Sequence, residues 1–194
     1  MPIAITEQKR ALRKEMTAKR DALSPIFRKQ MSEKVAKIEM PFDVADGAVV
    51  SGWFAMGTEL NPYPLMKRLA EENSASLALP AIEDGKLIFR AWVPGMQLKR
   101  VGFGLSEPGP EAREVDPDIL FVPLLAFDLR GYRMGYGKAY YDGGLSRLRA
   151  KKKITAVGLA FDEQCVETVP LEPHDERLDY VITEEGVRFS AGSD

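Results

Sequence analysis

The alternation of apolar and polar positions divides the chain into helices and strands. Leu12 and Met16 lie four residues apart among basic residues, which is the spacing of a helix with one apolar stripe. Ser24-Pro25 and Asn61-Pro62 each supply a helix N-cap residue followed by a proline suited to the first helical position. These signals predict helices over residues 6–23, 25–38, 62–72 and 140–152, the last one interrupted by Gly143-Gly144.

Short, almost continuously apolar runs predict buried strands. They cover residues 47–56, 76–79, 86–92, 118–125, 154–161 and 178–183, with Pro80 expected to end the second and a turn at 83–86 expected to join the second and third into a hairpin. Residues 94–117 are rich in Gly, Pro and Glu and are expected to be irregular.

The order of these elements predicts the fold class. Strands that alternate with helices indicate one α/β domain over residues 1–194 with a largely parallel sheet. Ligands bind beyond the carboxyl ends of the strands in such sheets. The loops after residues 56, 125 and 161 are therefore the candidate binding loops.

Composition excludes several classes of protein. The 194 residues are 45% hydrophobic and 29% charged, and no apolar run reaches the roughly 20 residues needed to span a bilayer. One cysteine, Cys165, cannot form an internal disulfide, and together with one histidine, His174, it is too little for a zinc site. The charged N-terminus lacks the apolar stretch of a signal peptide, so we expect a cytoplasmic protein.

The net charge of −2 hides a segregation of charge along the chain. Residues 1–37 carry ten Lys/Arg and four Asp/Glu, a net +6, and residues 130–153 carry eight Lys/Arg and one Asp, a net +7. Two basic segments far apart in the sequence can converge on one anionic ligand. Two solvated helix faces give the same pattern, and charge alone does not separate these interpretations.

The run from Asp128 to Asp142 concentrates the candidate chemistry, because it joins three glycines and three cations directly after an apolar strand. Glycines let backbone N–H groups approach a phosphate, cations neutralise it, and an aspartate can hold the magnesium of a nucleotide. Five residues separate Gly131 from Gly137-Lys138, and Ala139 has no hydroxyl, so the run is not a P-loop. By spacing alone it is either a phosphate-binding loop or a glycine-rich turn between a strand and a helix.

This run and four other segments together resemble the 5-formyltetrahydrofolate cyclo-ligase family. The order and spacing of the segments match over nearly the whole chain, which is more specific than any one motif. The central match is Arg133-Met134-Gly135-Tyr136-Gly137-Lys138-Ala139-Tyr140-Tyr141-Asp142, preceded by Val122-Pro123 and Ala126-Phe127-Asp128. The others are Lys9-Arg10-Ala11-Leu12-Arg13 with Arg20, Gly57-Thr58-Glu59-Leu60, Gly104-Leu105-Ser106-Glu107-Pro108 and residues 170–183.

The resemblance implies a three-layer α/β/α sandwich with a mostly parallel sheet, similar to sugar-phosphate isomerases and CoA-transferases. It implies a ligase that uses ATP and Mg²⁺ to convert 5-formyltetrahydrofolate to 5,10-methenyltetrahydrofolate, with release of ADP and phosphate. The formyl oxygen would attack the γ-phosphate, and the 10-nitrogen would then close the ring and expel phosphate. The partners would be these small molecules, with no nucleic acid and no membrane, and we expect a monomer.

The resemblance also implies roles for single residues. Lys138 and Arg133 would be catalytic, Asp142 and Asp175 would bind magnesium, and Glu59 would accept hydrogen bonds from the amide and amino edge of the pterin. His174 is not assigned as a base. The ATP-binding set would be Lys9, Arg10, Arg13, Arg133, Met134, Gly135, Tyr136, Gly137, Lys138, Ala139, Tyr140 and Tyr141. The substrate-binding set would be Phe54, Glu59, Trp92, Tyr136, Gly137, Lys138, Ala139 and Tyr140.

Two positions depart from the pattern of the family. Ala139 stands where the family has glycine, so its methyl group is expected to crowd the phosphates or to require a negative φ. Gly143-Gly144 replaces an arginine and an aromatic residue and is expected to loosen the start of the helix. Neither change removes a charged group that the mechanism needs.

Two other functions fit parts of the sequence. One is an enzyme of the same fold that acts on another phosphorylated or carboxylated substrate, but such an enzyme has no need for the pterin-binding acid Glu59 or for Trp92. The other is a non-catalytic relative that binds anions or RNA, and an RNA-binding surface gains nothing from the magnesium carboxylates Asp142 and Asp175.

Overall fold

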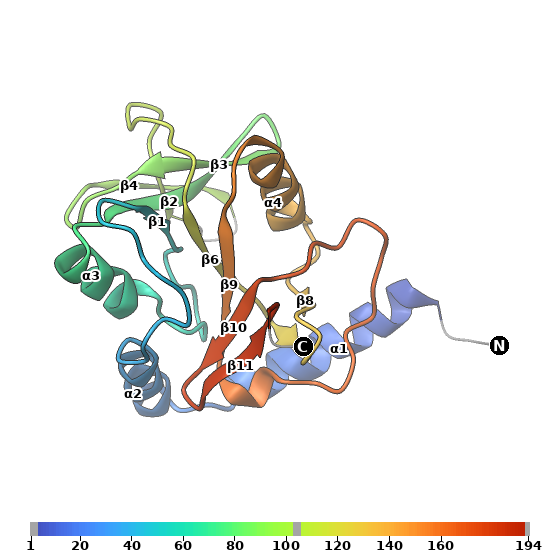
Figure 1. Ribbon diagram of the computed structural model, residues 1–194. Coiled ribbons are helices and arrows are strands. Elements are labelled where there is room, and N and C mark those ends of the chain that lie inside the picture. The colour runs from blue at the N-terminus through green and yellow to red at the C-terminus, as the bar shows by residue number, and fades with distance from the viewer. Residues whose placement is uncertain (1–3, 103–105, 193–194) are drawn as a thin grey trace.

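A seven-stranded sheet forms the centre of the protein, with strand order β11-β10-β9-β6-β1-β2-β3 (Figure 1). The computed structural model describes residues 4–102 and 106–192, so Gly104 and Leu105 of the mid-chain element lie outside the described residues. The five inner strands are parallel, as the sequence predicts, and the two edge strands are antiparallel. In chain order these strands are β1 (Val49–Ser51), β2 (Ser76–Glu83), β3 (Lys86–Ala91), β6 (Ile119–Pro123), β9 (Thr155–Leu159), β10 (Tyr180–Thr183) and β11 (Gly186–Ser190).

Helices cover both faces of the sheet, which confirms the expected three-layer α/β/α arrangement (Figure 1). On one face α2 (Pro25–Val35) and α3 (Tyr63–Glu72) pack on residues such as Phe121 of β6. On the other face Leu145 and Leu148 of α4 (Tyr140–Lys151) pack with Leu120 and Val122 of the same strand. Successive strand residues point to opposite faces, so the continuous apolar run that predicts β6 serves both cores.

The first helix, α1 (Ile5–Asp21), lies outside these layers and packs near the carboxyl edge of the sheet. Its Met16 is fully buried in a small cluster with Ala126, Met134 and Val169. Ala126 and Met134 belong to a two-stranded hairpin in which β7 (Ala126–Phe127) directly precedes the glycine-rich run and β8 (Arg133–Met134) lies within it. The hairpin therefore ties α1 to the segment with the candidate chemistry.

The predicted helices agree with the structure, and Ser24 caps α2 by accepting a 3.1 Å hydrogen bond from the amide of Phe27. One expectation about α4 is wrong, because Gly143-Gly144 does not interrupt it. A β-carbon built on Gly144 would lie 3.0 Å from Leu87, so this glycine lets the helix pack closely on β3. Packing thus offsets the low helix propensity of glycine.

Several strand boundaries differ from the prediction. The strand expected over 47–56 ends at Ser51, and the apolar residues after it turn into a loop. The second strand does not end at Pro80 but continues to Glu83, because beyond Ala78 it pairs only with β3 and so tolerates a residue without an N–H. The stretch expected to be irregular contains the short antiparallel pair β4 (Leu98–Arg100) and β5 (Ser106–Pro108), and β11 was not predicted at all.

Among the described residues, no helix has both the length and the apolar character needed to cross a membrane.

Candidate active site

A cleft of about 1000 Å³ lies at the carboxyl edge of the parallel strands. Its walls come from α1, from the loop after β1, from the end of β2, from the glycine-rich run up to the first turn of α4, and from the loop between β9 and β10. This is the edge at which ligands are expected in a parallel α/β sheet. The loops predicted after residues 56 and 125 both line it, and the loop after residue 161 reaches it only at its far end, through Glu172, His174 and Asp175.

Three cations of α1 line the cleft along one face of the helix. Lys9, Arg13 and Arg20 are separated by four and seven residues, which places them on one side of an α-helix. Arg13 donates from Nε to the carbonyl oxygen of Gly135 at 3.0 Å. The buried Arg20 donates to Thr58 Oγ1 at 3.1 Å and to the hydroxyl of Tyr136. The helix thereby contacts both the glycine-rich run and the loop after β1.

The glycine-rich run is held in shape by Asp128, whose side chain is completely buried. Its carboxylate accepts hydrogen bonds from the backbone amides of Arg130, Tyr132 and Val169 at 3.0, 3.2 and 2.9 Å. Gly131 adopts a φ of +84°, and a β-carbon there would lie 2.2 Å from the ring of Phe189. The start of the run is therefore a structural turn, and the ligand-facing part begins at Arg133.

The buried Arg133 and the partly buried Asp142 form an ion pair in the lining of the cleft. Arg133 NH2 lies 2.8 Å from Asp142 Oδ1, which also accepts from the amide of Glu176 at 3.0 Å. Burial lowers the pKa of Arg133, and the neighbouring carboxylates of Asp142 and Asp175 oppose that effect. The guanidinium is thus a fixed positive charge between two acidic groups.

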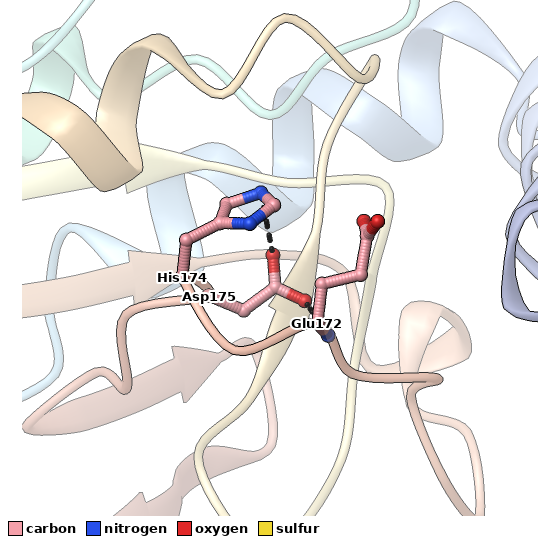
Figure 2. Close-up of side chains that lie close together, drawn as sticks. All are labelled: Glu172, His174 and Asp175. Carbon is pink, nitrogen blue, oxygen red and sulfur yellow. Dashed lines mark hydrogen bonds and ion pairs between the residues drawn. The ribbon is translucent and has the colours of Figure 1, made fainter.

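Two carboxylates, those of Glu172 and Asp175, bind the ammonium of Lys9. Lys9 Nζ lies 2.7 Å from Glu172 Oε2 and 2.7 Å from Asp175 Oδ2. Burial alone would raise the pKa of Asp175, but hydrogen bonds from Lys9 and from the amide of Glu172 lower it overall. Figure 2 shows Glu172, His174 and Asp175 close together on the loop before β10.

Within the described residues these three side chains form a group that could hold a metal ion, since one ligand atom from each lies within 4.8 Å of the others. Carboxylate oxygens are the donors that Mg²⁺ prefers, so Asp175 and Glu172 fit such an ion. The expected partner Asp142 also lines the cleft, but its Oδ1 already serves Arg133 and a backbone amide. The structure therefore groups Asp175 with Glu172 and His174 rather than with Asp142.

Glu59 also lines the cleft, from the loop after β1. Its Oε2 accepts hydrogen bonds from the indole of Trp53 and from the amide of Met56, both at 3.0 Å. Burial raises the pKa of Glu59, although these hydrogen bonds and the charge of Arg20 act against the rise. Two donors thus fix the orientation of a carboxylate in a half-buried position, where it can accept further hydrogen bonds from a ligand.

Most of the predicted site residues line the cleft. Arg10 and Trp92 do not: Arg10 points away from the face that carries Lys9 and pairs with Glu7 at 3.6 Å on the surface. Trp92 packs edge-on against Tyr63 of α3 instead, with ring centroids 5.8 Å apart. The predicted residues in the lining are Lys9, Arg13, Phe54, Glu59, Arg133, Met134, Gly135, Tyr136, Gly137, Lys138, Ala139, Tyr140, Tyr141, Asp142 and Asp175.

The lining also contains residues that the sequence did not assign to the site, and Arg20 and Glu172 are two of them. Arg20 carries a usable signal, because its helical spacing from Lys9 and Arg13 places all three on one face. Glu172 carries none, because it lies in an irregular loop and reaches Lys9 only through the tertiary fold.

The two predicted departures from the family pattern can now be located. Ala139 is the residue before α4, and its φ is +52° rather than the negative value expected for a residue with a side chain. The left-handed conformation costs a non-glycine residue about 1 kcal/mol or more. The hydroxyl of Tyr141, nearby in the lining, is buried and has no hydrogen-bond partner among the described residues.

A parallel α/β sheet with a cation-lined cleft at its carboxyl edge is characteristic of enzymes that act on anionic substrates. The chain belongs to the 5-formyltetrahydrofolate cyclo-ligase family, whose sequence pattern matches residues 5–184. Membership makes the protein a ligase and confirms the resemblance seen in the sequence.

Individual relatives match over nearly their full lengths. The chain is 31% identical to the 5-formyltetrahydrofolate cyclo-ligase of Escherichia coli K12, over 85% of this chain and 94% of that protein. It is 29% identical to the 5-formyltetrahydrofolate cyclo-ligase of Haemophilus influenzae, over 88% of this chain and 94% of that protein. The solved structure of Aquifex aeolicus 5,10-methenyltetrahydrofolate synthetase is 32% identical and superposes with a TM-score of 0.77, over 96% of this chain and 94% of that chain.

Proposed function

We propose that this protein converts 5-formyltetrahydrofolate to 5,10-methenyltetrahydrofolate in a reaction that depends on ATP and Mg²⁺. Family membership supports the proposal, as do relatives that carry this activity in their names. The observation that carries it is the cleft, which brings cations from α1 and from the glycine-rich run together with the half-buried carboxylate of Glu59. Such a site suits two ligands, one rich in phosphate and one with hydrogen-bond donors.

The chemistry starts from a poor leaving group, the oxygen of the formyl amide. This oxygen attacks the γ-phosphorus of ATP, the bond to the β,γ-bridging oxygen breaks, and ADP leaves. The formyl carbon then carries a phosphate ester and a C=N bond to the 5-nitrogen. The 10-nitrogen adds to that carbon and loses its proton, and phosphate leaves with the electrons of the C–O bond. The product is the conjugated methenyl ring.

The protein contributes position and charge rather than a nucleophile. Lys9 and Arg13 bind the phosphates from α1, and Lys138 binds the phosphoryl group that is transferred. Arg133 stays fixed by Asp142 and by the carbonyl oxygen of Glu176, at 2.6 Å, and supplies constant positive charge in the lining of the cleft. Preorganised charge of this kind stabilises the transition state without a reorganisation cost.

When bound with ATP, Mg²⁺ would supply charge neutralisation at the phosphates. Asp175 and Glu172 would hold the ion, and Asp142 would contribute its remaining oxygen or act only through Arg133. Lys9 now occupies the position between the carboxylates of Glu172 and Asp175. Lys9 therefore exchanges carboxylate partners for phosphate oxygens when the nucleotide arrives.

Glu59 and the exposed aromatic side chains bind the folate. Glu59 accepts hydrogen bonds from the amide and amino groups of the pterin, and Trp53 and Met56 keep it oriented. Phe54 and Tyr136 are 53% and 54% exposed, which is unusual for large apolar side chains and leaves their rings available for a flat ligand.

A direct assay tests the proposal. Purified protein with 5-formyltetrahydrofolate and magnesium-ATP is expected to produce the near-ultraviolet absorbance of the conjugated methenyl product, together with one ADP for each product molecule. Omitting ATP or chelating Mg²⁺ is expected to abolish the signal. Absence of any absorbance rise at saturating substrates would refute the proposed reaction.

A further inference from the structure

A second groove, of about 330 Å³, adjoins the cleft beneath the start of α4. Three segments line it: the turn between β2 and β3, the end of the glycine-rich run, and the exposed side of the first turns of α4. Leu87, Lys138, Ala139 and Tyr140 line both the groove and the cleft, so the two spaces meet at these residues. Lining residues found only in the groove are Gly85, Lys86, Gly143, Gly144 and Arg147.

The groove is cationic. Lys86, Lys138 and Arg147 line it, and none of the described residues in its lining is acidic. Arg147 is anchored there because NH2 donates to the carbonyl oxygen of Leu87 at 2.7 Å, while Asp116 approaches its other nitrogen only to 3.7 Å and is shared with Lys151. The ammonium of Lys86 has no ion pair or hydrogen bond within the part of the chain that the structure describes. Three positive charges from three elements thus face one small space.

The floor of the groove is left open by Gly143. A β-carbon at that position would have no atom within 4 Å, so any side chain there would extend into free space. The neighbouring Gly144 differs, because its β-carbon would touch Leu87 at 3.0 Å. Helix propensity favours alanine over glycine at exposed helical positions by about 1 kcal/mol. Gly143 therefore costs helix stability and keeps the groove empty.

The order of the strands places this groove on the folate side of the cleft. The loop before β10 carries Asp175, the loop after β1 carries Glu59, and Lys86 is the first residue of β3, directly after the turn that follows β2. In the sheet β1 lies between β6 and β2, so the carboxyl edge runs from the phosphate-binding side through Glu59 to Lys86. The apolar side chains of Ile82 and Leu87 line the cleft, and Leu87 lines the groove as well.

We propose that the groove binds the carboxylates of the glutamate at the end of the folate. The inference rests on the proposed function, which supplies a substrate whose pterin and glutamate ends are joined by an aromatic ring. With the pterin at Glu59, the ring lies against Ile82 and Leu87, and the glutamate reaches Lys86 and Arg147. The two carboxylates of the glutamate then lie beside two cations, the ammonium of Lys86 and the guanidinium of Arg147.

The test varies the protein and the substrate together. Lys86→Glu reverses one charge on an exposed turn, and 5-formyltetrahydropteroate is the same substrate without its glutamate. Lys86→Glu is expected to raise KM for 5-formyltetrahydrofolate about tenfold, the size of one lost charged contact. KM for the pteroate analogue and KM for ATP are expected to change less than about twofold, which corresponds to no lost contact. Lys153→Gln, an exposed lysine just before the amino end of β9, is the matched control and leaves all three values unchanged.

A second variant tests the space rather than the charge. Gly143→Phe fills the groove and is expected to raise KM for the folate while leaving KM for the pteroate analogue near that of the unaltered protein. Equal increases for both substrates, an increase confined to ATP, or no increase in either variant would each overturn the inference. Turnover by the unaltered protein decides the proposed function separately, so the failure of one is not the failure of the other.

Discussion

The ammonium of Lys9 lies 2.7 Å from Oδ2 of Asp175, although the two residues are 166 positions apart in the chain. The same nitrogen is 2.7 Å from Oε2 of Glu172, so one cation joins α1 to the loop before β10. Two carboxylates held around one positive charge form a cation site that a lysine occupies while no nucleotide is bound. The proposed reaction requires that lysine to turn toward phosphate.

We predict that Lys9→Met raises KM for ATP about tenfold, because one charged contact with the phosphates is lost, while KM for the folate changes little. Steady-state kinetics with each substrate varied in turn measures both values. Lys14→Met is the matched control, since Lys14 is an exposed lysine of the same helix that does not line the cleft. A larger effect on KM for the folate than on KM for ATP would contradict the role assigned to Lys9.

The same variant makes a prediction about Mg²⁺ alone. Without Lys9, the carboxylates of Glu172 and Asp175 face each other with no cation between them, so Mg²⁺ has no competitor for their oxygens. Mg²⁺ without ATP is therefore expected to raise the melting temperature of Lys9→Met more than that of the unaltered protein. The triple variant Lys9→Met/Glu172→Gln/Asp175→Asn should lose the effect. Equal shifts in all three proteins would exclude a cation site at these carboxylates.

Asp142 and Asp175 are predicted to differ in their effect on stability. Asp142→Asn leaves the buried guanidinium of Arg133 without its paired charge, and breaking such a pair costs about 3 kcal/mol. Asp175→Asn is milder, because Lys9 keeps Glu172 as a partner. Urea denaturation of both variants compares their free energies of unfolding. If Asp142→Asn were as stable as Asp175→Asn, the ion pair with Arg133 would not be the main role of Asp142.

The sequence predicts those parts of the fold that depend on local pattern. Continuous apolar runs identify β6 and β9 because strands covered on both faces have no polar side. It fails where the outcome depends on a distant partner. The sequence suggests that Trp92 is a ligand-binding aromatic residue, but in the structure its ring packs edge-on against Tyr63 of α3. The edge strand β11 was missed because three of its five residues are glycine, arginine and serine, which carry little strand signal.

The site divides in the same way. Cations of α1 are predictable because helical spacing puts Lys9, Arg13 and Arg20 on one face. The pairing of Lys9 with Glu172 is not predictable from the sequence, because the loop that carries Glu172 has no repeating pattern that would indicate where its side chains point. The roles of the two aspartates at the ends of the glycine-rich run also need the structure: Asp128 is wholly buried and shapes the turn, and Asp142 lines the cleft.

Replacing Ala139 by glycine is predicted to stabilise the protein. Ala139 has a φ of +52°, a conformation that costs a side-chain-bearing residue about 1–2 kcal/mol. Glycine removes that cost but adds about 0.4–1 kcal/mol of entropy to the unfolded chain, which leaves a net gain of somewhat under about 1 kcal/mol. The measurement is the free energy of unfolding in urea.

The control for Ala139→Gly is Ala22→Gly. Ala22 follows α1 with a φ of −74°, so glycine there relieves no strain and is expected to destabilise the protein. The two variants should therefore change stability in opposite directions. Loss of stability in both would mean that the left-handed conformation of Ala139 carries no appreciable cost. KM for ATP should not increase in Ala139→Gly, because the smaller residue gives the phosphates more room.

Lys138→Ala is predicted to lower kcat while leaving the fold intact, since the residue is exposed at the rim of the cleft. Loss of a charged group that acts on the transferred phosphoryl costs on the order of 2 kcal/mol or more in the transition state. The expected fall in kcat is therefore at least about thirtyfold, with an unchanged melting temperature. Lys138→Arg should restore part of the rate. A kcat like that of the unaltered protein would refute the catalytic role of Lys138.

Glu59 is predicted to make folate binding sensitive to acid. Burial raises the pKa of its carboxyl above the usual value of 4.5, and only the ionised form can accept hydrogen bonds from both donors of the pterin. As the pH falls through this raised pKa the carboxylate gains a proton, so KM for the folate is expected to rise at a pH where an ordinary glutamate is still ionised. Glu59→Gln should have a high KM for the folate at every pH, without the additional rise at low pH. Kinetics between about pH 5 and 8, with KM for ATP measured alongside, gives the profile. A profile shared by both substrates, or unaltered in Glu59→Gln, would place the titrating group elsewhere.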